Sequence, residues 1–311
     1  MRIAAAALAT VLLTTGCTSE PAVGPVEPAA PEVTTPAPPT STPSLTPEPP
    51  ARFEAARAMR TVRHLAGRIG PRLATGPAFR EAAAYVEQRF AAEGYSVRRQ
   101  SFRVPAGDSW GVPVDAGRSA NVVATGPGFD PAAPYVVIGA HLDTVAVAPG
   151  AEDNASGVAV LLELARVLGG DGQVVLVAFG GEEPRGPGEL HHFGSKEYVA
   201  RLGDDGVNLR AMVSLDRVGV GRVVPVSSVE GTPAALRDRL ADVAGDLDIA
   251  TVVEHDSASD HESFADAGFL AARIGSTPYA GYHSAQDVPS VVDPAQLGRV
   301  GRLLIAWLRA S

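Results

Sequence analysis

Cysteine is almost absent from this chain, whose 311 residues include only Cys17. No intramolecular disulfide can form, so the fold has to rest on its hydrophobic core, with bound metal as a further source of stability. Positive charge is also scarce, because 26 Lys and Arg face 35 Asp and Glu and the formal net charge is −9. This balance argues against a nucleic-acid partner bound through a general basic surface.

The N-terminus lacks a hydrophobic run long enough to span a bilayer comfortably. The apolar stretch at residues 3–13 follows the basic start Met1-Arg2 and ends at Thr14-Thr15-Gly16-Cys17, an order typical of an export signal. Residues 1–16 resemble a bacterial lipoprotein signal, in which the cysteine after the cleavage point is lipidated. Thr14 stands where such signals usually have an aliphatic residue, so an ordinary secretory signal is the alternative. We expect an extracytoplasmic protein, anchored in the cell membrane through Cys17 or else secreted.

Residues 17–51 have almost no large apolar side chains. Pro, Thr, Glu, Ala and Ser dominate this segment, and such a composition cannot bury a core. We therefore predict a disordered, semi-extended tether that would hold the rest of the chain away from a membrane surface.

From residue 52 onward, apolar strand-like runs alternate with segments of helical spacing. The predicted strands are 95–104, 121–124, 135–140, 173–179, 209–215, 249–253 and 269–274. The predicted helices are 53–65, 79–90, 157–168, 193–202, 232–243, 260–267 and a last helix that starts at Asp293-Pro294. This alternation predicts an α/β fold for residues 52–311: a single three-layer α/β/α domain with a mostly parallel, mixed central sheet.

Acidic and imidazole side chains follow the predicted central strands and lie in the loops near them. They are His141, Asp143, Asp153, Glu182, Glu183, Asp216 and His283, with Tyr282 beside the last. So many carboxylates cannot share one place without compensation, because like charges repel and desolvation is costly. A pair of divalent cations would solve this problem, and mixed His and carboxylate ligands suit Zn²⁺. On strand ends alone, a structural or binding α/β domain remains the alternative to a metal hydrolase.

The motifs around these residues carry a family resemblance. In order, they are His141-Leu142-Asp143-Thr144-Val145, Glu152-Asp153-Asn154-Ala155-Ser156-Gly157, Gly181-Glu182-Glu183, Ser214-Leu215-Asp216, Ser259-Asp260-His261 and Tyr282-His283-Ser284-Ala285-Gln286-Asp287. Together they resemble the M28 family of co-catalytic zinc peptidases. The resemblance implies the zinc-peptidase, phosphorylase/hydrolase-like fold and an exported exopeptidase, most simply an aminopeptidase that attacks peptides with a hydroxide shared by two Zn²⁺.

The resemblance also implies roles. One zinc would be bound by His141 and Asp216 and the other by Glu183 and His283, while Asp153 would bridge the two. Glu182 would be the general base and Asp143 would orient His141. Tyr282 would polarise the scissile carbonyl, with plain packing as its alternative. The rival functions are a glutaminyl-peptide cyclotransferase that uses one zinc and a non-catalytic binding lipoprotein on the same scaffold.

Four further features stay open at this point. The segment 184–192 lengthens the loop after Glu183 and could wall off part of a substrate pocket. We expect His191 and His192 to face solvent, with metal ligation as the alternative. Arg217 either binds a substrate carboxylate or pairs with an acid of the site. Asp287 could support His283. The sequence does not decide the oligomeric state, the preferred side chain, the identity of the metal in vivo, or whether the enzyme acts as an aminopeptidase or a carboxypeptidase.

Overall fold

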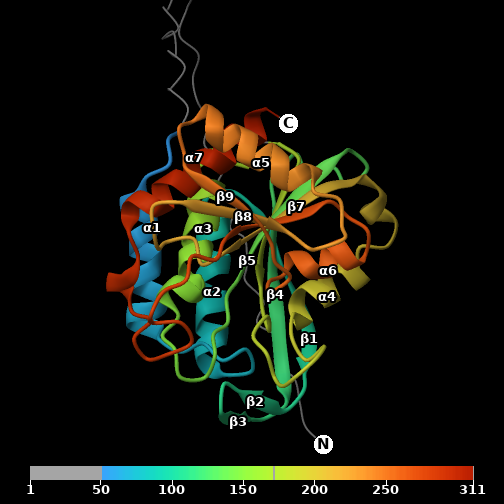
Figure 1. Cartoon of the computed structure of the whole chain (residues 1–311). Helices are drawn as coiled ribbons and strands as arrows, with labels where there is room; N and C mark the ends of the chain where they lie inside the picture. The colour runs from blue at the N-terminus through green and yellow to red at the C-terminus, as the bar shows by residue number, and fades with distance from the viewer. Residues whose placement is uncertain (1–50, 171, 311) are drawn as a thin grey trace, which may run out of the picture. The chain divides into compact units, whose positions relative to one another are not determined.

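Eight strands form one mixed sheet in the order β1-β4-β6-β5-β7-β10-β8-β9. The computed structural model describes residues 51–170 and 172–310, and Figure 1 shows their arrangement. The strands of this sheet are β1 Ser96–Val104, β4 Gly117–Thr125, β5 Tyr135–His141, β6 Val174–Phe179, β7 Leu209–Asp216, β8 Val224–Ser228, β9 Thr251–His255 and β10 Ala271–Gly275. A separate hairpin consists of β2 Gly107–Ser109 and β3 Val112–Val114.

The four central strands run parallel. β5 pairs with β6 and β7 in parallel, and β10 pairs with β7 in parallel. β4 is antiparallel to β6, β1 to β4 and β8 to β10. All residues of β6 and nearly all of β5 and β7 are buried, as expected of strands that are covered on both faces. The carboxyl ends of β5, β6 and β7 therefore meet at one edge of the sheet, where open α/β folds place their ligands.

Helices cover both faces of the sheet, as predicted (Figure 1). The helices α1, α2, α3, α5 and α7 share the larger core cluster, and α4 and α6 pack on the other face in a cluster that contains Tyr198 and Phe264. Their bounds are α1 Ala55–Val62, α2 Pro77–Ala92, α3 Ser156–Leu168, α4 Phe193–Ala200, α5 Ala235–Asp246, α6 His261–Asp266 and α7 Pro294–Arg309. The three-layer α/β/α fold is thus confirmed.

Most element boundaries agree with the predicted ones, and the departures have local causes. The last helix starts at Pro294, and the carboxylate of Asp293 caps it by accepting a hydrogen bond from the Ala295 N–H at 2.8 Å. The helix predicted at 232–243 instead begins at Ala235. The sequence alone did not predict β8, although all five of its residues are buried. Pro225 and two serines interrupt its short apolar run, and proline is unusual in a strand interior.

The predicted signal segment (1–16) and almost all of the predicted tether (17–51) lie outside the described residues. Among the helices of residues 51–170 and 172–310, none combines the length and the apolar character that a bilayer crossing requires.

Candidate metal centre

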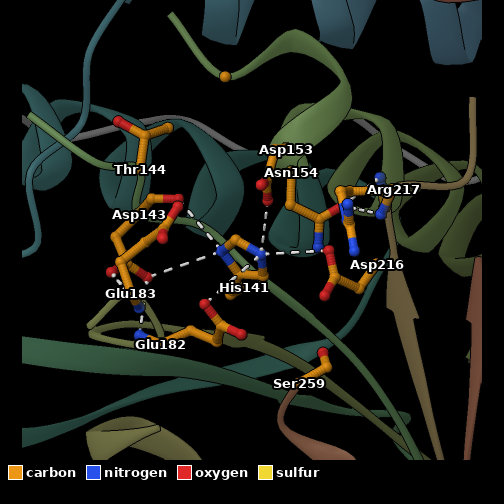
Figure 2. A network of polar contacts seen from close by, with 12 residues as sticks. His141, Asp143, Thr144, Asp153, Asn154, Glu182, Glu183, Asp216, Arg217 and Ser259 are labelled. Atoms are coloured by element: carbon orange, nitrogen blue, oxygen red, sulfur yellow. Dashed lines mark hydrogen bonds and ion pairs between the residues drawn. The ribbon is translucent and has the colours of Figure 1, made fainter. Parts of the chain in front are cut away.

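The carboxyl ends of three neighbouring parallel strands bring the predicted site residues together. His141 is the last residue of β5 and Asp216 the last of β7, while Glu182 and Glu183 follow β6. Figure 2 shows these side chains converging from separate elements. Residues that are 75 positions apart in the chain, His141 and Asp216, come within 3.4 Å (Nε2 to Oδ1).

Two ligand clusters share one carboxylate, that of Asp153. Its Oδ1 lies 3.1 Å from Nε2 of His141, which also faces Asp216. Its Oδ2 lies 3.2 Å from Nε2 of His283, which is also 3.2 Å from Oε2 of Glu183. All five side chains are buried. Each cluster offers imidazole nitrogen and carboxylate oxygen to one point, which is the donor set that Zn²⁺ accepts.

The charges of this cluster require compensation. Burial and the neighbouring Asp153 raise the pKa of Glu183 to about 8. Burial alone would lower the pKa of His283, but the carboxylates of Asp153 and Glu183 raise it to about 10. Buried carboxylates are stable as anions only beside positive charge. The residues present therefore fit a pair of divalent cations, one on each side of Asp153.

The loop that carries Asp153 is held by a second acid, Asp287. The Asp287 carboxylate accepts hydrogen bonds from the backbone N–H groups of Glu152 at 2.8 Å and Asp153 at 3.1 Å. On the other side, the Asn154 amide donates to the Leu215 carbonyl of β7 at 2.8 Å. Asp287 thus supports Asp153, and its carboxylate does not take the place beside His283 that we considered for it.

Asp143 has two contacts that the sequence did not reveal. The Nδ1 of His141 lies 3.2 Å from the backbone carbonyl of Asp143, whereas the nearest carboxylate oxygen is 3.9 Å away. The carboxylate accepts hydrogen bonds from the backbone N–H groups of Glu182 at 3.1 Å and Glu183 at 3.3 Å. Asp143 therefore contacts His141 mainly through its backbone, and its carboxylate fixes the turn that carries the two glutamates.

Comparison with known proteins identifies the family of this chain. A sequence profile described as Peptidase family M28 matches residues 121–308, more than half of the chain. The chain belongs to this family. It is similar to Aminopeptidase YwaD of Bacillus subtilis (strain 168), with 29% identity over 186 residues that make up 55% of this chain and 40% of that protein. The match spans less than half the length of the curated relatives.

Solved structures of two kinds share the fold of this M28 chain. A zinc aminopeptidase from Bacillus subtilis superposes with a TM-score of 0.73 at 18% identity, over 83% of this chain and 95% of that chain. A glutaminyl cyclase from Porphyromonas gingivalis superposes with a TM-score of 0.70 at 24% identity, over 83% of this chain and 98% of that chain. These likenesses establish the fold, and both named activities occur on it.

Beyond the ligand clusters, this M28 chain has one neighbour of Glu182 that the sequence alone did not predict, His192. We expected His191 and His192 to face solvent, but His192 is only 3% exposed. Its Nε2 lies 3.3 Å from Oε1 of Glu182, and its Nδ1 lies 3.0 Å from Oε2 of Glu262. Burial would lower the pKa of His192, but the two carboxylates raise it to about 10. The expectation of solvent exposure was therefore wrong for His192.

The longer loop folds back on itself, which explains the burial of His192. The Arg185 N–H donates to the Leu190 carbonyl at 2.7 Å, and the His192 N–H donates to the Glu182 carbonyl at 3.0 Å. These bonds bring residues 190–192 back beside Glu182, next to the carboxyl end of β6. The loop closes one wall of a pocket of about 280 Å³, which Glu182, His191, His192 and Pro184 line together with residues of the ligand clusters.

Another part of the pocket rim is aromatic. Tyr282 is 40% exposed and stacks on the imidazole of His283 with ring centroids 3.8 Å apart, so core packing does not account for it. Trp110, at the tip of the β2–β3 hairpin, meets His283 edge to face at 4.4 Å. The Asp108 N–H of this hairpin donates to the Arg185 carbonyl at 3.0 Å, which joins the two parts of the rim. Sequence reasoning missed Trp110, whose only signal was a tryptophan before a glycine in a turn.

A buried arginine, Arg72, supports the backbone segments that carry the site. The sequence alone did not identify it. The side chain of Arg72 donates to the carbonyls of Leu65, Gly70, Leu142, Pro149 and Gly150 at 2.6–3.1 Å. It thereby ties the segment after His141 to the loop that leads to Asp153. Burial lowers the pKa of Arg72 to about 10, which still leaves it charged at neutral pH.

Proposed function

We propose that this M28 chain is a zinc-dependent exopeptidase with two metal ions that removes N-terminal residues from peptides. The observation that carries the proposal is Asp153, whose two carboxylate oxygens face two separate imidazoles. A shared carboxylate between two His and carboxylate clusters is the arrangement expected of a two-metal hydrolase, whose ions lie roughly 3.5–4 Å apart. His141 and Asp216 would hold one ion, and Glu183 and His283 the other.

The chemistry of the proposed reaction divides between the ions and the residues around them. Two divalent ions held there would polarise a shared water molecule and lower its pKa. Glu182 would accept a proton from the attacking water and deliver it to the leaving amine. Its Oε2 lies 3.9 Å from Nε2 of His141, on the side of the ligand clusters, while its Oε1 contacts His192. Tyr282 would donate its hydroxyl hydrogen to the oxygen of the scissile carbonyl.

A glutaminyl-peptide cyclotransferase that uses one zinc is the second candidate, and the similarity to the Porphyromonas gingivalis enzyme favours it. The presence of both ligand clusters argues for the peptidase, because a one-metal enzyme needs only one of them. The third candidate, a non-catalytic binding lipoprotein, would be expected to have lost a ligand or the base, and none is missing here.

Metal counting combined with turnover tests the proposal. The purified chain should contain about two zinc ions per molecule by elemental analysis and should release chromophore from aminoacyl p-nitroanilides. A chelator should abolish this release, and added Zn²⁺ should restore it. One zinc per molecule, with cyclisation of N-terminal glutamine and release of ammonia, would establish the cyclotransferase instead. Stoichiometric zinc without either activity would favour the third candidate, the non-catalytic binding protein.

We further propose that the enzyme works outside the cytoplasmic membrane, anchored through a lipid on Cys17. The export-signal pattern of residues 1–16 and the position of the one cysteine of the chain support this placement. The acidic pocket and its exposed aromatic rim would then meet peptides in the extracytoplasmic space.

A further inference from the structure

Arg217 is a cation of the pocket wall that forms no ion pair with a carboxylate of the described residues. Two arginines line this pocket, Arg217 and Arg273. Arg273 forms ion pairs with Asp216 at 2.8 Å and with Asp256. Within residues 51–170 and 172–310, no carboxylate oxygen lies within 4.0 Å of a side-chain nitrogen of Arg217, whose hydrogen bond goes to the hydroxyl of Ser276.

The carboxylates nearest to Arg217 already have other partners. Asp216 uses Oδ1 toward His141 and Oδ2 toward Arg273. Asp153 uses one oxygen for each imidazole of the ligand clusters. Divalent ions at these clusters would cancel more of the negative charge around them. Arg217 would therefore be left without an anionic partner from the protein in the metal-loaded enzyme.

The guanidinium of Arg217 is held in place before any ligand arrives. Its Nη2 donates to the Ser276 hydroxyl at 2.8 Å, and its Cζ lies 4.6 Å from the ring centre of Tyr282. The backbone is fixed as well, because the Ser276 N–H donates to the Arg217 carbonyl at 3.1 Å and the Arg217 N–H donates to the Asn154 side chain at 3.3 Å. Figure 2 shows Arg217 directly beside Asp216 and Asn154.

The backbone conformation of Arg217 is further evidence that its surroundings hold the residue in place. Arg217 has φ of 55°, in the left-handed region that residues other than glycine rarely adopt. Such a conformation persists only where the surrounding contacts impose it, and it occurs most often at functional sites. A flexible surface arginine would have neither this backbone conformation nor these contacts with Ser276, Tyr282 and Asn154.

We infer that Arg217 forms an anion subsite for a carboxylate of the peptide substrate, an inference that rests on the proposed peptidase function. A guanidinium binds a carboxylate through parallel charge-assisted hydrogen bonds, and a site walled by an aromatic ring strengthens them. Because Arg217 follows the ligand Asp216 and stacks on Tyr282, the bound carboxylate lies close to the scissile bond. It belongs either to an acidic side chain of the residue removed or to the C-terminus of a very short peptide.

Two matched substrate pairs identify the carboxylate. Glutamyl and glutaminyl p-nitroanilide differ only in side-chain charge, and Leu-Gly and Leu-glycinamide differ only in the C-terminal charge. The wild-type enzyme should prefer the charged member of one pair. Arg217→Met should reduce that preference in kcat/KM by about tenfold to a hundredfold, as expected when a charge-assisted contact to substrate is lost. Arg217→Lys should restore part of the preference. The substrate pair whose preference changes in Arg217→Met identifies the source of the carboxylate, either the acidic side chain or the C-terminus.

The control variant is Arg222→Met, which removes an exposed arginine from the loop between β7 and β8 and should leave both preferences as in the wild type. If Arg217→Met keeps the wild-type preference in both pairs, Arg217 stabilises the site without touching substrate and the subsite is refuted. The same conclusion holds if the wild type prefers the neutral member of each pair.

Binding without turnover separates this inference from the peptidase proposal. The α-hydroxamates of glutamate and glutamine and the dipeptide pair can be titrated calorimetrically into the zinc-loaded chain. Tighter binding of a charged member that Arg217→Met abolishes would support the subsite even in a chain that hydrolyses no peptide. Normal turnover with equal binding of charged and neutral members would refute the subsite and leave the peptidase proposal intact.

Discussion

The imidazole Nε2 of His192 lies 3.3 Å from Oε1 of Glu182, and the Nδ1 of the same ring lies 3.0 Å from Glu262. The histidine thus stands between the proposed general base and a second glutamate at the pocket wall. With Oε1 engaged by His192, the other oxygen of Glu182 remains for the reacting water. His192 would therefore position Glu182, and the 184–192 loop that carries it would then take part in the proposed reaction.

Removal of the hydrogen-bond donor at position 192 should slow turnover. In His192→Phe the ring persists and the contact to Glu182 is lost, which should lower kcat by roughly tenfold to a hundredfold because a hydrogen bond to a charged group contributes about 1.5–3 kcal/mol. KM and zinc content should change little. His192→Gln, which can still donate, should recover part of kcat.

His191→Phe is the matched control for this experiment. His191 is the sequence neighbour of His192 and lies 3.8 Å from Glu262, but no contact joins it to Glu182. The rings of His191 and His192 meet edge to face at 4.1 Å, and phenylalanine keeps a ring at that contact. This variant should therefore keep kcat within about threefold of the wild type. Equal losses of kcat in the two phenylalanine variants would show that the loop as a whole, and not the contact to Glu182, matters.

The charge of Glu182 itself should be needed for catalysis and not for metal binding. Glu182→Gln preserves the shape and the contact to His192 but cannot accept a proton, so turnover should fall by about 10²–10⁴-fold, the usual contribution of a general base. Elemental analysis should find the same zinc content as in the wild type. Full activity in this variant would refute the proposed mechanism, and loss of zinc would reassign Glu182 as a ligand.

Arg72 should be a main source of stability for the site. Its side chain donates to five backbone carbonyls around the site, and Arg72→Met would remove all of these hydrogen bonds. The carbonyls of Leu65 and Gly150 would keep a backbone N–H donor, whereas those of Gly70, Leu142 and Pro149 would lose the donor that Arg72 gives them. Buried unpaired groups are costly, so we expect the free energy of unfolding to fall by about 3–5 kcal/mol. Thermal unfolding of the zinc-loaded chain should show this as a lower Tm. Arg68→Met, at an exposed position nearby, should lie within about 0.5 kcal/mol of the wild type.

The convergence of the candidate ligands could be predicted from sequence because each follows a buried apolar strand or belongs to a recognisable motif. His141 and Asp216 end strands that pair with each other in parallel, so their proximity follows from the order of the strands. Arg72 could not be predicted in the same way. Its partners are backbone carbonyls, which leave no trace in residue identity, and three of them lie 70 or more positions away.

The rim of the pocket was unpredictable for a different reason. Trp110 and His192 belong to a short hairpin and an irregular loop, and neither has a hydrophobic period that would orient its side chains. Their positions depend on single hydrogen bonds between loops, such as the one from Asp108 to Arg185. Tertiary contacts of this kind place the rim of the pocket, whereas the ends of the strands place most of the candidate metal ligands.

Export and anchoring should depend on Cys17. In a bacterial host, the wild-type chain should fractionate with membranes and incorporate labelled fatty acid, because a lipidated cysteine supplies the anchor. Cys17→Ala should lose the label, and any chain that is still exported should appear in the soluble extracytoplasmic fraction. An unlabelled wild type that is already soluble would establish the ordinary secretory signal.

The stability of the folded domain should depend on pH through His261, which is buried and is not one of the candidate metal ligands. Its Nε2–H donates to the Asp256 carbonyl at 2.7 Å, and burial followed by the charge of Arg273 lowers the pKa of His261 to about 4. The unfolded chain protonates this ring near its ordinary pKa of about 6.5, so below that pH the unfolded state binds the extra proton and gains stability. The contribution of neutral His261 is therefore complete above pH of about 6.5 and is lost as the pH falls toward about 4.

His261→Gln isolates this contribution, because an amide can keep the hydrogen bond to Asp256 but does not titrate. The free energies of unfolding of the two proteins should differ by a constant amount above pH of about 6.5. Below that pH the curves should diverge, with the wild type losing up to about 3 kcal/mol more by pH of about 4. Acid release of zinc affects both proteins equally and cancels in the difference. Parallel curves across the whole range would show that His261 is protonated at its ordinary pKa in the folded state.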